Sequence, residues 1–457
     1  MRFILLTLMF VCAFAGSARA GLTVIRDTEI ETTLRSWMTP IWRAAGLNPD
    51  AVKLILVSSD DFNAFVAGGS NIFVYTGMLA QTKNPGEILG VLAHETGHIA
   101  GGHLIRGRAA MERASYEALL GTILGVAVGV AGGGKAAGGI MMGGQGLGMA
   151  SFLAHSRVQE SSADQAGLRF MQGAGYSPQG MVTLLESMKA QEYRPQGQQT
   201  AYLQTHPMTA DRLTAMEAGA AKSPFKDKPY PAEWNDAYAR IKAKLLGFTS
   251  PERVAWVYSD KDTSTPALYA KTIAAYRQSR KEQAVSLADQ LIAREPNNPY
   301  FHEIKGQMLR DFSDITGAAA SYRKAVSLKP DAALIRIDLA QVLVEMAQTQ
   351  KKPALYREAE DNLDAAYQRE QRSSEIQRLY ATIYGREGDQ PRAQYHLAEQ
   401  SMLQGRHREA TKLLTGALAG MTPGSPDYRK AQDLKVYLDS LPKKDKDEDD
   451  ERENKRR

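Results

Sequence analysis

The spacing of apolar residues near the start of the chain predicts one helix followed by a small sheet. Between residues 27 and 48, large apolar side chains recur at helical intervals until Asn48-Pro49 breaks the pattern. Val52 to Val57 is mostly apolar and β-branched, and within Asn71 to Tyr75 the apolar Ile72 and Val74 alternate with their neighbours. Because Gly68-Gly69 lies between these segments, we expect two strands with a turn between them.

Two further helices are predicted on either side of an unusual glycine-rich stretch. The first spans about Pro85 to Arg108, with proline at its start, and the second resumes near Ser156. Residues 116–152 between them hold twelve glycines. Three of them recur every four residues, at Gly121, Gly125 and Gly129. This spacing lets apolar helices approach closely in lipid. We expect an insert that faces a membrane or flanks a site; a transmembrane hairpin and a flexible loop are the alternatives.

From Thr265 onward the helical pattern repeats along the chain. Pro296 and Pro330 are 34 residues apart, which is the tetratricopeptide period. One repeat has consensus residues at Gly306, Ala318, Tyr322, Ala325 and Pro330. A third repeat is lengthened near residues 348–355, and further helix pairs follow. Because a single pair cannot bury its apolar face, the pairs stack into a solenoid whose concave surface binds proteins by default. A generic helical bundle is the alternative.

Composition supports globular cores and excludes one class of partner. The 457 residues are 43% hydrophobic, which is enough for two or three domains. The formal net charge is only +5 with both signs abundant, and no basic stripe is interleaved with aromatic residues, so we expect no nucleic-acid partner. The irregular segment 224–264, with one helix near residues 234–246, is predicted to connect two domains. The charged tail 442–457 is predicted to be disordered.

The beginning of the chain, residues 1–20, predicts export. Arg2, an apolar run from Phe3 to Ala15 and the small residues Ala18 and Ala20 have the layout of a signal peptide cleaved after Ala20. An uncleaved membrane anchor is the alternative. The sole cysteine, Cys12, lies inside this signal, so the mature chain has none. A bacterial periplasm suits a large exported protein without cysteine.

One motif on the predicted helix 85–108 points to a specific chemistry. His94 and His98 are four residues apart, so both imidazoles lie on one helix face and can hold a single metal ion. Glu95 is then placed beside that ion, where its carboxylate can take a proton from an attacking water. The pattern is typical of a zinc metallopeptidase, and a purely structural histidine pair is the alternative.

A third histidine ligand from the same helix is not expected. The long zinc signature needs that histidine ten residues after His94, and this position is Leu104. On a continuous helix His103 would be rotated about 140° from His98. The remaining ligand must therefore come from elsewhere in the chain.

Two carboxylates in the helix that resumes near Ser156 are the best candidates. Glu160 and Asp164 lie one turn apart on one face, flanked by the small residues Ala163 and Gly167, which permit close helix packing. Glu160 is a candidate third ligand, and Asp164 is a candidate acceptor for a hydrogen bond from a ligating imidazole. Such a pair on its own is usually a solvated face.

These motifs resemble those of the M48 family of zinc metallopeptidases, over roughly Asp27 to Ser223. The residues that carry the resemblance are His94-Glu95-x-x-His98 with His103, Glu160-x-x-Ala163-Asp164, and Thr205-His206-Pro207 with Arg212. The resemblance implies that His94, His98 and Glu160 bind one zinc ion. It also implies that Glu95 is the general base.

The resemblance also gives the segment around His206 a role at the site. It implies that His206 either plugs the site or helps to stabilise the tetrahedral intermediate. Independently, Pro207 fixes the local backbone and favours a turn or a helix start at this point. For Arg212, a pair with Asp164, a contact with the substrate backbone and a surface position all stay open.

The expected fold is an α+β zincin-like metallopeptidase domain, mostly helical with a small sheet, followed by an all-α tetratricopeptide-repeat solenoid. The first spans residues 21–223 and the second residues 265–441. The strand 72–75, or the segment 63–65 before it, is a candidate open edge to which a substrate peptide adds as another strand. An ordinary hairpin is the alternative.

The resemblance is to exported family members that join such a domain to repeats. It implies a zinc-dependent endopeptidase of the periplasm, either free or associated with a membrane surface, that acts in quality control of outer-membrane proteins. Its clients would be unfolded or misassembled outer-membrane proteins, and its partner the outer-membrane β-barrel assembly machinery. Two alternatives remain open: a repeat-based chaperone or scaffold with a gated or silent peptidase site, and a membrane-embedded processing peptidase.

Overall fold

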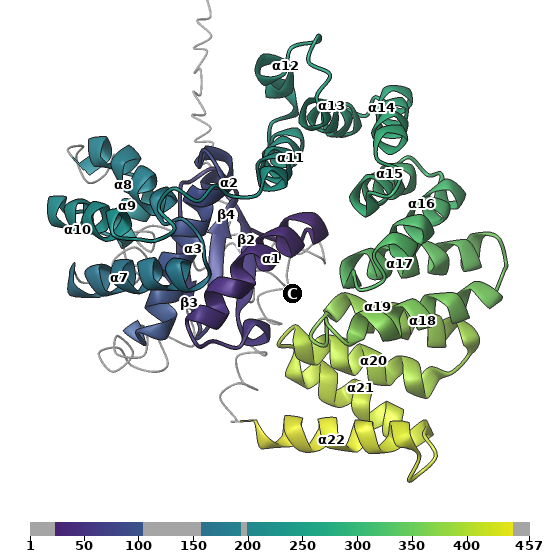
Figure 1. Ribbon diagram of the computed structural model, residues 1–457. Helices are drawn as coiled ribbons and strands as arrows, with labels where there is room; N and C mark the ends of the chain where they lie inside the picture. The colour runs from purple at the N-terminus through teal and green to yellow at the C-terminus, as the bar shows by residue number, and fades with distance from the viewer. Residues whose placement is uncertain (1–22, 104–156, 193–198, 442–457) are drawn as a thin grey trace, which may run out of the picture.

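The computed structural model describes residues 23–103, 157–192 and 199–441 (Figure 1). The predicted signal peptide, the glycine-rich insert 116–152 and the charged tail 442–457 lie outside these described residues. Among the helices that are described, none is long and apolar enough to cross a membrane.

A four-stranded sheet lies within the N-terminal half. Its strands are β1 (Thr23–Ile25), β2 (Lys53–Ser58), β3 (Ala64–Ala67) and β4 (Asn71–Tyr75), in the spatial order β1, β2, β4, β3. β2 and β4 are parallel, and the two outer strands run antiparallel to their neighbours. Both predicted strands are present. Because β4 is internal, only the segment 63–65 of the two predicted edge segments lies at an edge of the described sheet, where it includes the first residues of β3.

The glycine turn does not join the two predicted strands directly: it joins β4 to β3, a strand that the sequence pattern did not predict. Gly68 and Gly69 have φ values of 64° and 93°, in the left-handed region that glycine adopts without steric cost. The two strands form an antiparallel hairpin in which Phe65 stacks on Phe73 with ring centroids 4.9 Å apart.

Helices pack around the sheet and share one apolar core with it. Their bounds are α1 (Thr28–Ala44), α2 (Thr76–Gln81), α3 (Pro85–Ala100), α7 (Arg157–Gly173), α8 (Gln179–Glu192), α9 (Ala201–Thr205) and α10 (Ala210–Ala221). The buried side chains of this core include Leu34, Trp42, Ile88, Leu92, Met171 and Met181. In Figure 1, α7, α8 and α10 lie on the side of α3 away from the repeats.

The metal helix of the sequence prediction is α3. Asn84 caps its first turn by accepting a hydrogen bond from the backbone of Glu87, and Pro85 occupies the first helical position. The prediction that this helix continues to Arg108 is wrong, because it ends at Ala100. Gly102 then has φ 61°, which turns the chain away from the helix axis.

The predicted connector contains a helix that belongs to two cores. α11 (Ala232–Thr249) is followed by a 3₁₀ turn at Pro251–Arg253 and by α12 (Val254–Val257). At its start, Trp234 stacks on Trp37 of α1 with ring centroids 4.9 Å apart. At its end, Gly247 packs so closely on the next helix that an added Cβ would lie 2.8 Å from Ile273. The segment is therefore a packed joint rather than a loose linker.

Residues 265–440 form the predicted solenoid of helices, and the predicted fold class is confirmed. The helices are α13 (Thr265–Arg277), α14 (Lys281–Arg294), α15 (Pro299–Asp311), α16 (Ile315–Leu328), α17 (Ala333–Thr349), α18 (Ala354–Tyr367), α19 (Ser374–Glu387), α20 (Gln390–Leu403), α21 (His407–Gly420) and α22 (Pro426–Ser440). The consensus glycine packs as the repeat requires, because a Cβ on Gly306 would lie 2.9 Å from the ring of Tyr322.

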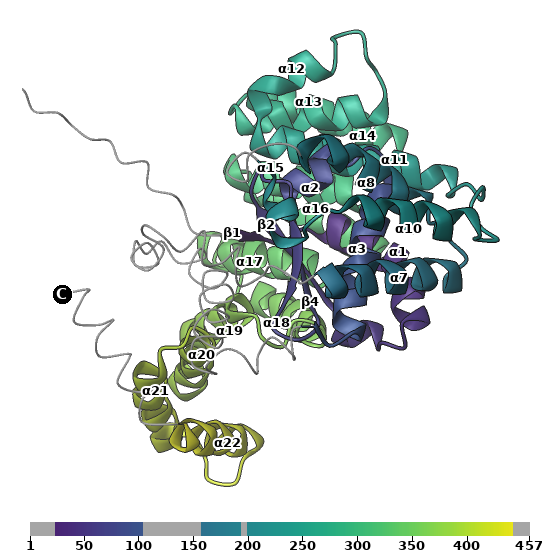
Figure 2. The same ribbon diagram turned by 90° about the vertical axis from the view of Figure 1, so that its left-hand side faces the viewer.

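The solenoid curves around the α1 side of the N-terminal half, as Figures 1 and 2 show. Arg26 pairs with Glu370, with its Nη2 2.8 Å from Oε1. Lys244 of α11 lies 2.7 Å from Asp27 Oδ2 and 3.2 Å from Glu29 Oε2. Two hydrogen bonds join the start of α1 to the repeats. The Thr28 hydroxyl donates to Glu303 of α15 at 3.1 Å, and the Tyr269 hydroxyl of α13 donates to Glu29 at 2.9 Å. The start of α1 is thus fixed by polar contacts inside the curve of the repeats.

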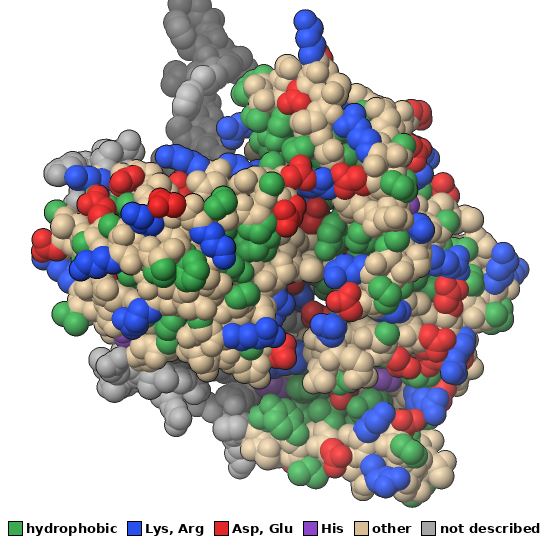
Figure 3. Space-filling view, in the orientation of Figure 1, with side chains coloured by type: hydrophobic (Ala, Val, Ile, Leu, Met, Phe, Trp, Pro, Cys, Tyr) green, Lys and Arg blue, Asp and Glu red, His purple; other side chains and the backbone are tan. Residues whose placement is uncertain are grey.

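The outer surface carries both charge signs. On the face shown in Figure 3, Lys and Arg side chains are interspersed with Asp and Glu over both halves. This mixture agrees with the similar numbers of basic and acidic residues in the sequence.

Candidate metal centre

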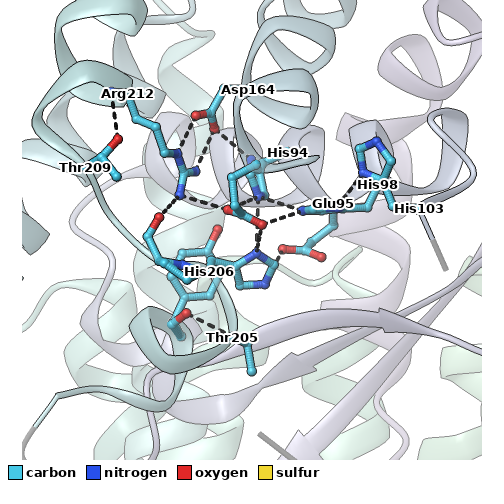
Figure 4. A network of polar contacts seen from close by, with 12 residues as sticks. His94, Glu95, His98, His103, Asp164, Thr205, His206, Thr209 and Arg212 are labelled. Atoms are coloured by element: carbon cyan, nitrogen blue, oxygen red, sulfur yellow. Dashed lines mark hydrogen bonds and ion pairs between the residues drawn. The ribbon is translucent and has the colours of Figure 1, made fainter. Parts of the chain in front are cut away.

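Three of the predicted site residues lie on α3. The helix is buried from Pro85 to His98, since it crosses the core of the N-terminal half. In Figure 4, His94, Glu95 and His98 come from this helix to one cluster of polar side chains. The Nε2 atoms of His94 and His98 lie 3.0 Å apart. The two imidazoles converge, as their four-residue spacing predicts.

Glu160 faces these imidazoles from α7. Its Oε1 atom lies 3.3 Å from His98 Nε2, and its Oε2 atom lies 3.4 Å from His94 Nε2. α7 reaches this position because small residues line its contact with α3: a Cβ on Gly97 would lie only 2.6 Å from the carbonyl oxygen of Ala163. Close packing of the two helices therefore sets the position of this carboxylate.

His206 approaches the same point from α9. It directly follows this short helix, and its ring stacks on Tyr202 with centroids 4.4 Å apart. His206 Nδ1 lies 3.3 Å from His94 Nε2 and 3.2 Å from Glu160 Oε1. The residue is 1% exposed. Its place at a helix end before Pro207 agrees with the turn that the sequence favours.

The four side chains are spaced as ligands of one ion. One donor atom from each of His94, His98, Glu160 and His206 can be chosen so that all lie within 4.8 Å of one another. A tetrahedral zinc ion with bonds of about 2.0–2.2 Å holds its ligands roughly 3.3–3.5 Å apart, close to the distances between these donors. Imidazole nitrogens and a carboxylate oxygen are zinc ligands. The cluster therefore fits one zinc ion.

Asp164 and Arg212 support this cluster from behind. His94 Nδ1 lies 2.8 Å from Asp164 Oδ1, so His94 donates there and its Nε2 lone pair points to the cluster. Arg212 binds both oxygens of Asp164 at 2.7 and 2.9 Å. It also lies 2.8 Å from Glu160 Oε2 and donates to the carbonyl oxygen of Pro207 at 2.7 Å. Of the three positions open for Arg212, the structure shows the pair with Asp164, and the side chain is buried rather than on the surface.

The carboxylates make the cluster attractive to a cation. Burial alone lowers the pKa of His94, but Glu160 and Asp164 outweigh burial and raise that pKa to about 10. Burial raises the pKa of Glu160, yet His206 and His94 hold it well below its usual range. For Asp164 burial is likewise outweighed, by the hydrogen bonds from His94 and Arg212, which lower its pKa. Without a metal ion, the carboxylates favour the protonated form of His94. A bound metal ion would supply that positive charge instead.

Glu95 lies next to the cluster without joining it. Both of its carboxylate oxygens are buried and have no hydrogen-bond partner among the described residues. The Nε2 atom of His206 lies 3.4 Å from Glu95 Oε1. Burial raises the pKa of Glu95, and the nearby His206 opposes this rise. A buried carboxylate with unsatisfied oxygens is arranged to accept a proton.

His103 is the residue whose contact the sequence reasoning missed. As expected, it does not belong to the group of four donors found in the described residues. Its Nδ1 nevertheless lies 2.9 Å from His98 Nδ1, on the side of that ring away from the cluster. The sequence feature that could have indicated this contact is the pair Gly101-Gly102, which follows the end of α3 and lets the chain turn back.

Comparison with known proteins agrees with this geometry. Residues 25–220 match the model of peptidase family M48. The chain is 25% identical over 309 residues to the beta-barrel assembly-enhancing protease of Yersinia pestis, covering 64% of this chain and 60% of that protein. The protein of the same name in Escherichia coli K12 is 25% identical over 307 residues, covering 65% and 61%. The metalloprotease LoiP of Escherichia coli K12 is 30% identical over 183 residues, covering 38% and 66%.

The extent of these matches defines what they identify. The chain spans 60% and 61% of the length of the two assembly-enhancing proteases. The family match covers β2, β3 and β4, nearly all of the helices around the sheet and every residue of the four-donor cluster. Residues 25–220 therefore form a domain of peptidase family M48.

Proposed function

We propose that this chain is a zinc-dependent endopeptidase whose cleavage centre is built from His94, His98, Glu160 and Glu95. The observation that carries the proposal is Glu95, a buried carboxylate with no hydrogen-bond partner among the described residues, beside four donors that converge on one point. A structural zinc site has no need of such a group. A hydrolytic site needs one to accept the proton of the attacking water.

The residues of the site have separate roles in peptide hydrolysis. Zinc, when bound, polarises a carbonyl and lowers the pKa of water. His94, His98 and Glu160 hold the ion, and Asp164 keeps His94 in the tautomer that presents Nε2. Glu95 accepts the proton of the attacking water and returns it to the leaving amine. Burial raises the pKa of Glu95, which favours its acceptance of a proton.

His206 closes the site in this conformation. Its Nδ1 occupies the fourth donor position, and zinc centres that catalyse hydrolysis keep one position open. We propose that His206 plugs the site in the resting state and that α9 withdraws to admit a substrate. The polar anchor of this segment is Arg212, which holds the carbonyl oxygen of Pro207.

For the setting of the reaction, we propose the periplasm, with unfolded or misassembled outer-membrane proteins as substrates. Support comes from the predicted signal peptide and from the name of the similar beta-barrel assembly-enhancing proteases. The repeats would recruit these clients or the outer-membrane β-barrel assembly machinery, because stacked helix pairs provide an extended protein-binding surface. Contact with a membrane surface remains part of the proposal.

A repeat-based chaperone or scaffold with a silent site is the second candidate. The observation that favours it is the same closed fourth position at His206. The two candidates differ in turnover: a scaffold never cleaves a client even when zinc is bound and His206 is removed. The third reading, a membrane-embedded processing peptidase, depends on residues 116–152, which lie outside the described residues. It stays a prediction.

The test is cleavage of a denatured outer-membrane β-barrel protein by the zinc-loaded chain and by Glu95→Gln. Both are measured with and without His206→Ala, so that a closed site does not hide activity. We expect Glu95→Gln to lose about 10²–10⁴-fold in turnover and to keep its zinc. Glu186→Gln, at an exposed carboxylate on α8, is the matched control and should cleave normally. Undiminished cleavage by Glu95→Gln contradicts its role as base.

A further inference from the structure

His98, one of the four metal donors, forms a buried pair with His103, which is not one of them. Their Nδ1 atoms lie 2.9 Å apart, and their rings cross at 75° with centroids separated by 5.0 Å. His98 is 0% and His103 is 4% exposed. Because His98 Nε2 faces the donors, this contact uses the ring nitrogen that points away from them. A hydrogen bond here acts on a ligand without touching the ion.

We propose that His103 is a positioning residue for the metal centre. When His98 Nε2 binds the ion, the ring carries its proton on Nδ1 and donates it to His103 Nδ1. This bond fixes the tautomer and the ring orientation of His98, as outer hydrogen bonds do for ligating histidines in general. The inference rests on the proposed zinc site and adds a residue to it.

The local backbone is built to bring His103 to this place. α3 ends at Ala100, and Gly102 has φ 61°, a conformation that favours glycine. Gly101 makes room for the imidazole, because a Cβ there would lie 2.5 Å from His103 Nε2. Both glycines therefore help to place His103: Gly101 leaves space for its ring, and Gly102 turns the chain toward His98.

The two ligating histidines of α3 are supported by different chemistry. His94 donates to Asp164, a carboxylate whose charge is matched by Arg212. Arg212 already contacts Glu160 as well, so its charge is shared between two carboxylates. A further carboxylate beside His98 would add negative charge without a partner. An imidazole accepts the same hydrogen bond while staying neutral, which explains why this position suits histidine.

The test compares three substitutions of His103 in the full chain. His103→Asn keeps an acceptor where Nδ1 stands, since its side-chain oxygen takes a similar position. His103→Leu keeps much of the volume but offers no acceptor, and His103→Ala removes both. The readouts are zinc affinity, measured by competition with a chelator, and the visible spectrum of the cobalt-substituted protein at saturating metal. Thermal unfolding of the metal-free chain monitors folding separately.

We expect His103→Leu and His103→Ala to bind zinc about 10–100-fold more weakly and to show an altered cobalt spectrum. His103→Asn should restore most of the affinity and the wild-type spectrum. The inference is overturned if His103→Leu binds zinc like the wild type, or if His103→Asn is as impaired as His103→Leu, since the ring would then matter only for packing. Failure of the proposed function gives a different result, namely no zinc bound by the wild-type chain.

Discussion

Arg212 and Asp164 form a buried two-point ion pair directly behind the metal donors. Nε and Nη2 of Arg212 lie 2.7 and 2.9 Å from Oδ2 and Oδ1 of Asp164. The same Oδ1 atom lies 2.8 Å from His94 Nδ1, and Nη1 of Arg212 donates to the carbonyl oxygen of Pro207. One guanidinium thus links α7, a metal-binding face of α3 and the segment that carries His206.

This ion pair predicts a loss of zinc affinity when the guanidinium group of Arg212 is replaced. Arg212→Lys keeps the charge but cannot bind two oxygens in one plane. We expect zinc affinity to fall about 10–100-fold, because Asp164 no longer holds His94 in place. The matched control is Arg240→Lys, at another two-point pair with Glu295 far along the sequence. Equal zinc affinity in the two variants would falsify this role of Arg212.

A second prediction concerns His206. If this residue plugs the site, His206→Ala frees a coordination position and raises turnover several-fold, while His94, His98 and Glu160 retain the zinc. Initial rates on a denatured outer-membrane protein measure the effect. His407→Ala, on repeat helix α21, is the control for loss of a histidine as such. A fall in turnover would instead favour the other role, stabilisation of the tetrahedral intermediate.

The glycine inside the metal motif gives a third prediction. A Cβ on Gly97 would lie 2.6 Å from the carbonyl oxygen and 2.9 Å from the Cα of Ala163, so Gly97→Ala must push α7 away from α3. We expect a loss of about 1–3 kcal/mol in unfolding free energy and weaker zinc binding, because Glu160 moves with α7. Gly385→Ala is the matched control, since its Cβ would lie at an ordinary 3.8 Å from Ala393. Similar losses in both variants would contradict the explanation.

The sequence predicted this site well where the chemistry depends on local spacing. His94 and His98 lie four residues apart on one helix, and Glu160 with Asp164 repeats that spacing, so each pair converges once α3 and α7 meet. The contact of His103 could not be predicted from the assumption of a continuous helix, because the chain turns at Gly102. The packing of α11 on two cores and the contacts of Arg212 depend on segments that are distant in the sequence, so residue spacing alone does not predict them.

A fourth prediction concerns pH and the joint between the two halves. Glu303 accepts a hydrogen bond from Thr28, but its Oε2 atom is buried without a hydrogen-bond partner among the described residues. Burial raises the pKa of Glu303 from 4.5 to about 8, Lys244 opposes the rise, and Asp27 reinforces it. Between these two values the folded chain holds a proton that the unfolded chain has lost. Stability should therefore fall as the pH rises from about 4.5 to about 8.

Glu303→Gln removes this dependence and keeps an acceptor for Thr28. We expect the variant to exceed the wild type by about 1–3 kcal/mol in unfolding free energy above pH 8, and to match it near pH 4.5. Urea unfolding at a series of pH values measures the difference. Glu358→Gln, which breaks an exposed pair with Arg323, should change stability by less than about 1 kcal/mol at every pH. A constant difference for Glu303→Gln across the series would rule out its titration as the cause.

The most direct test of the metal centre is X-ray absorption at the zinc edge of the purified chain, together with its zinc content. The structure predicts one zinc ion per chain with three imidazole ligands and one carboxylate, at about 2.0–2.2 Å. His206→Ala should show two imidazoles and an added oxygen ligand. A wild-type chain that binds no zinc, or that shows the same imidazole number with and without His206, would contradict the proposed centre.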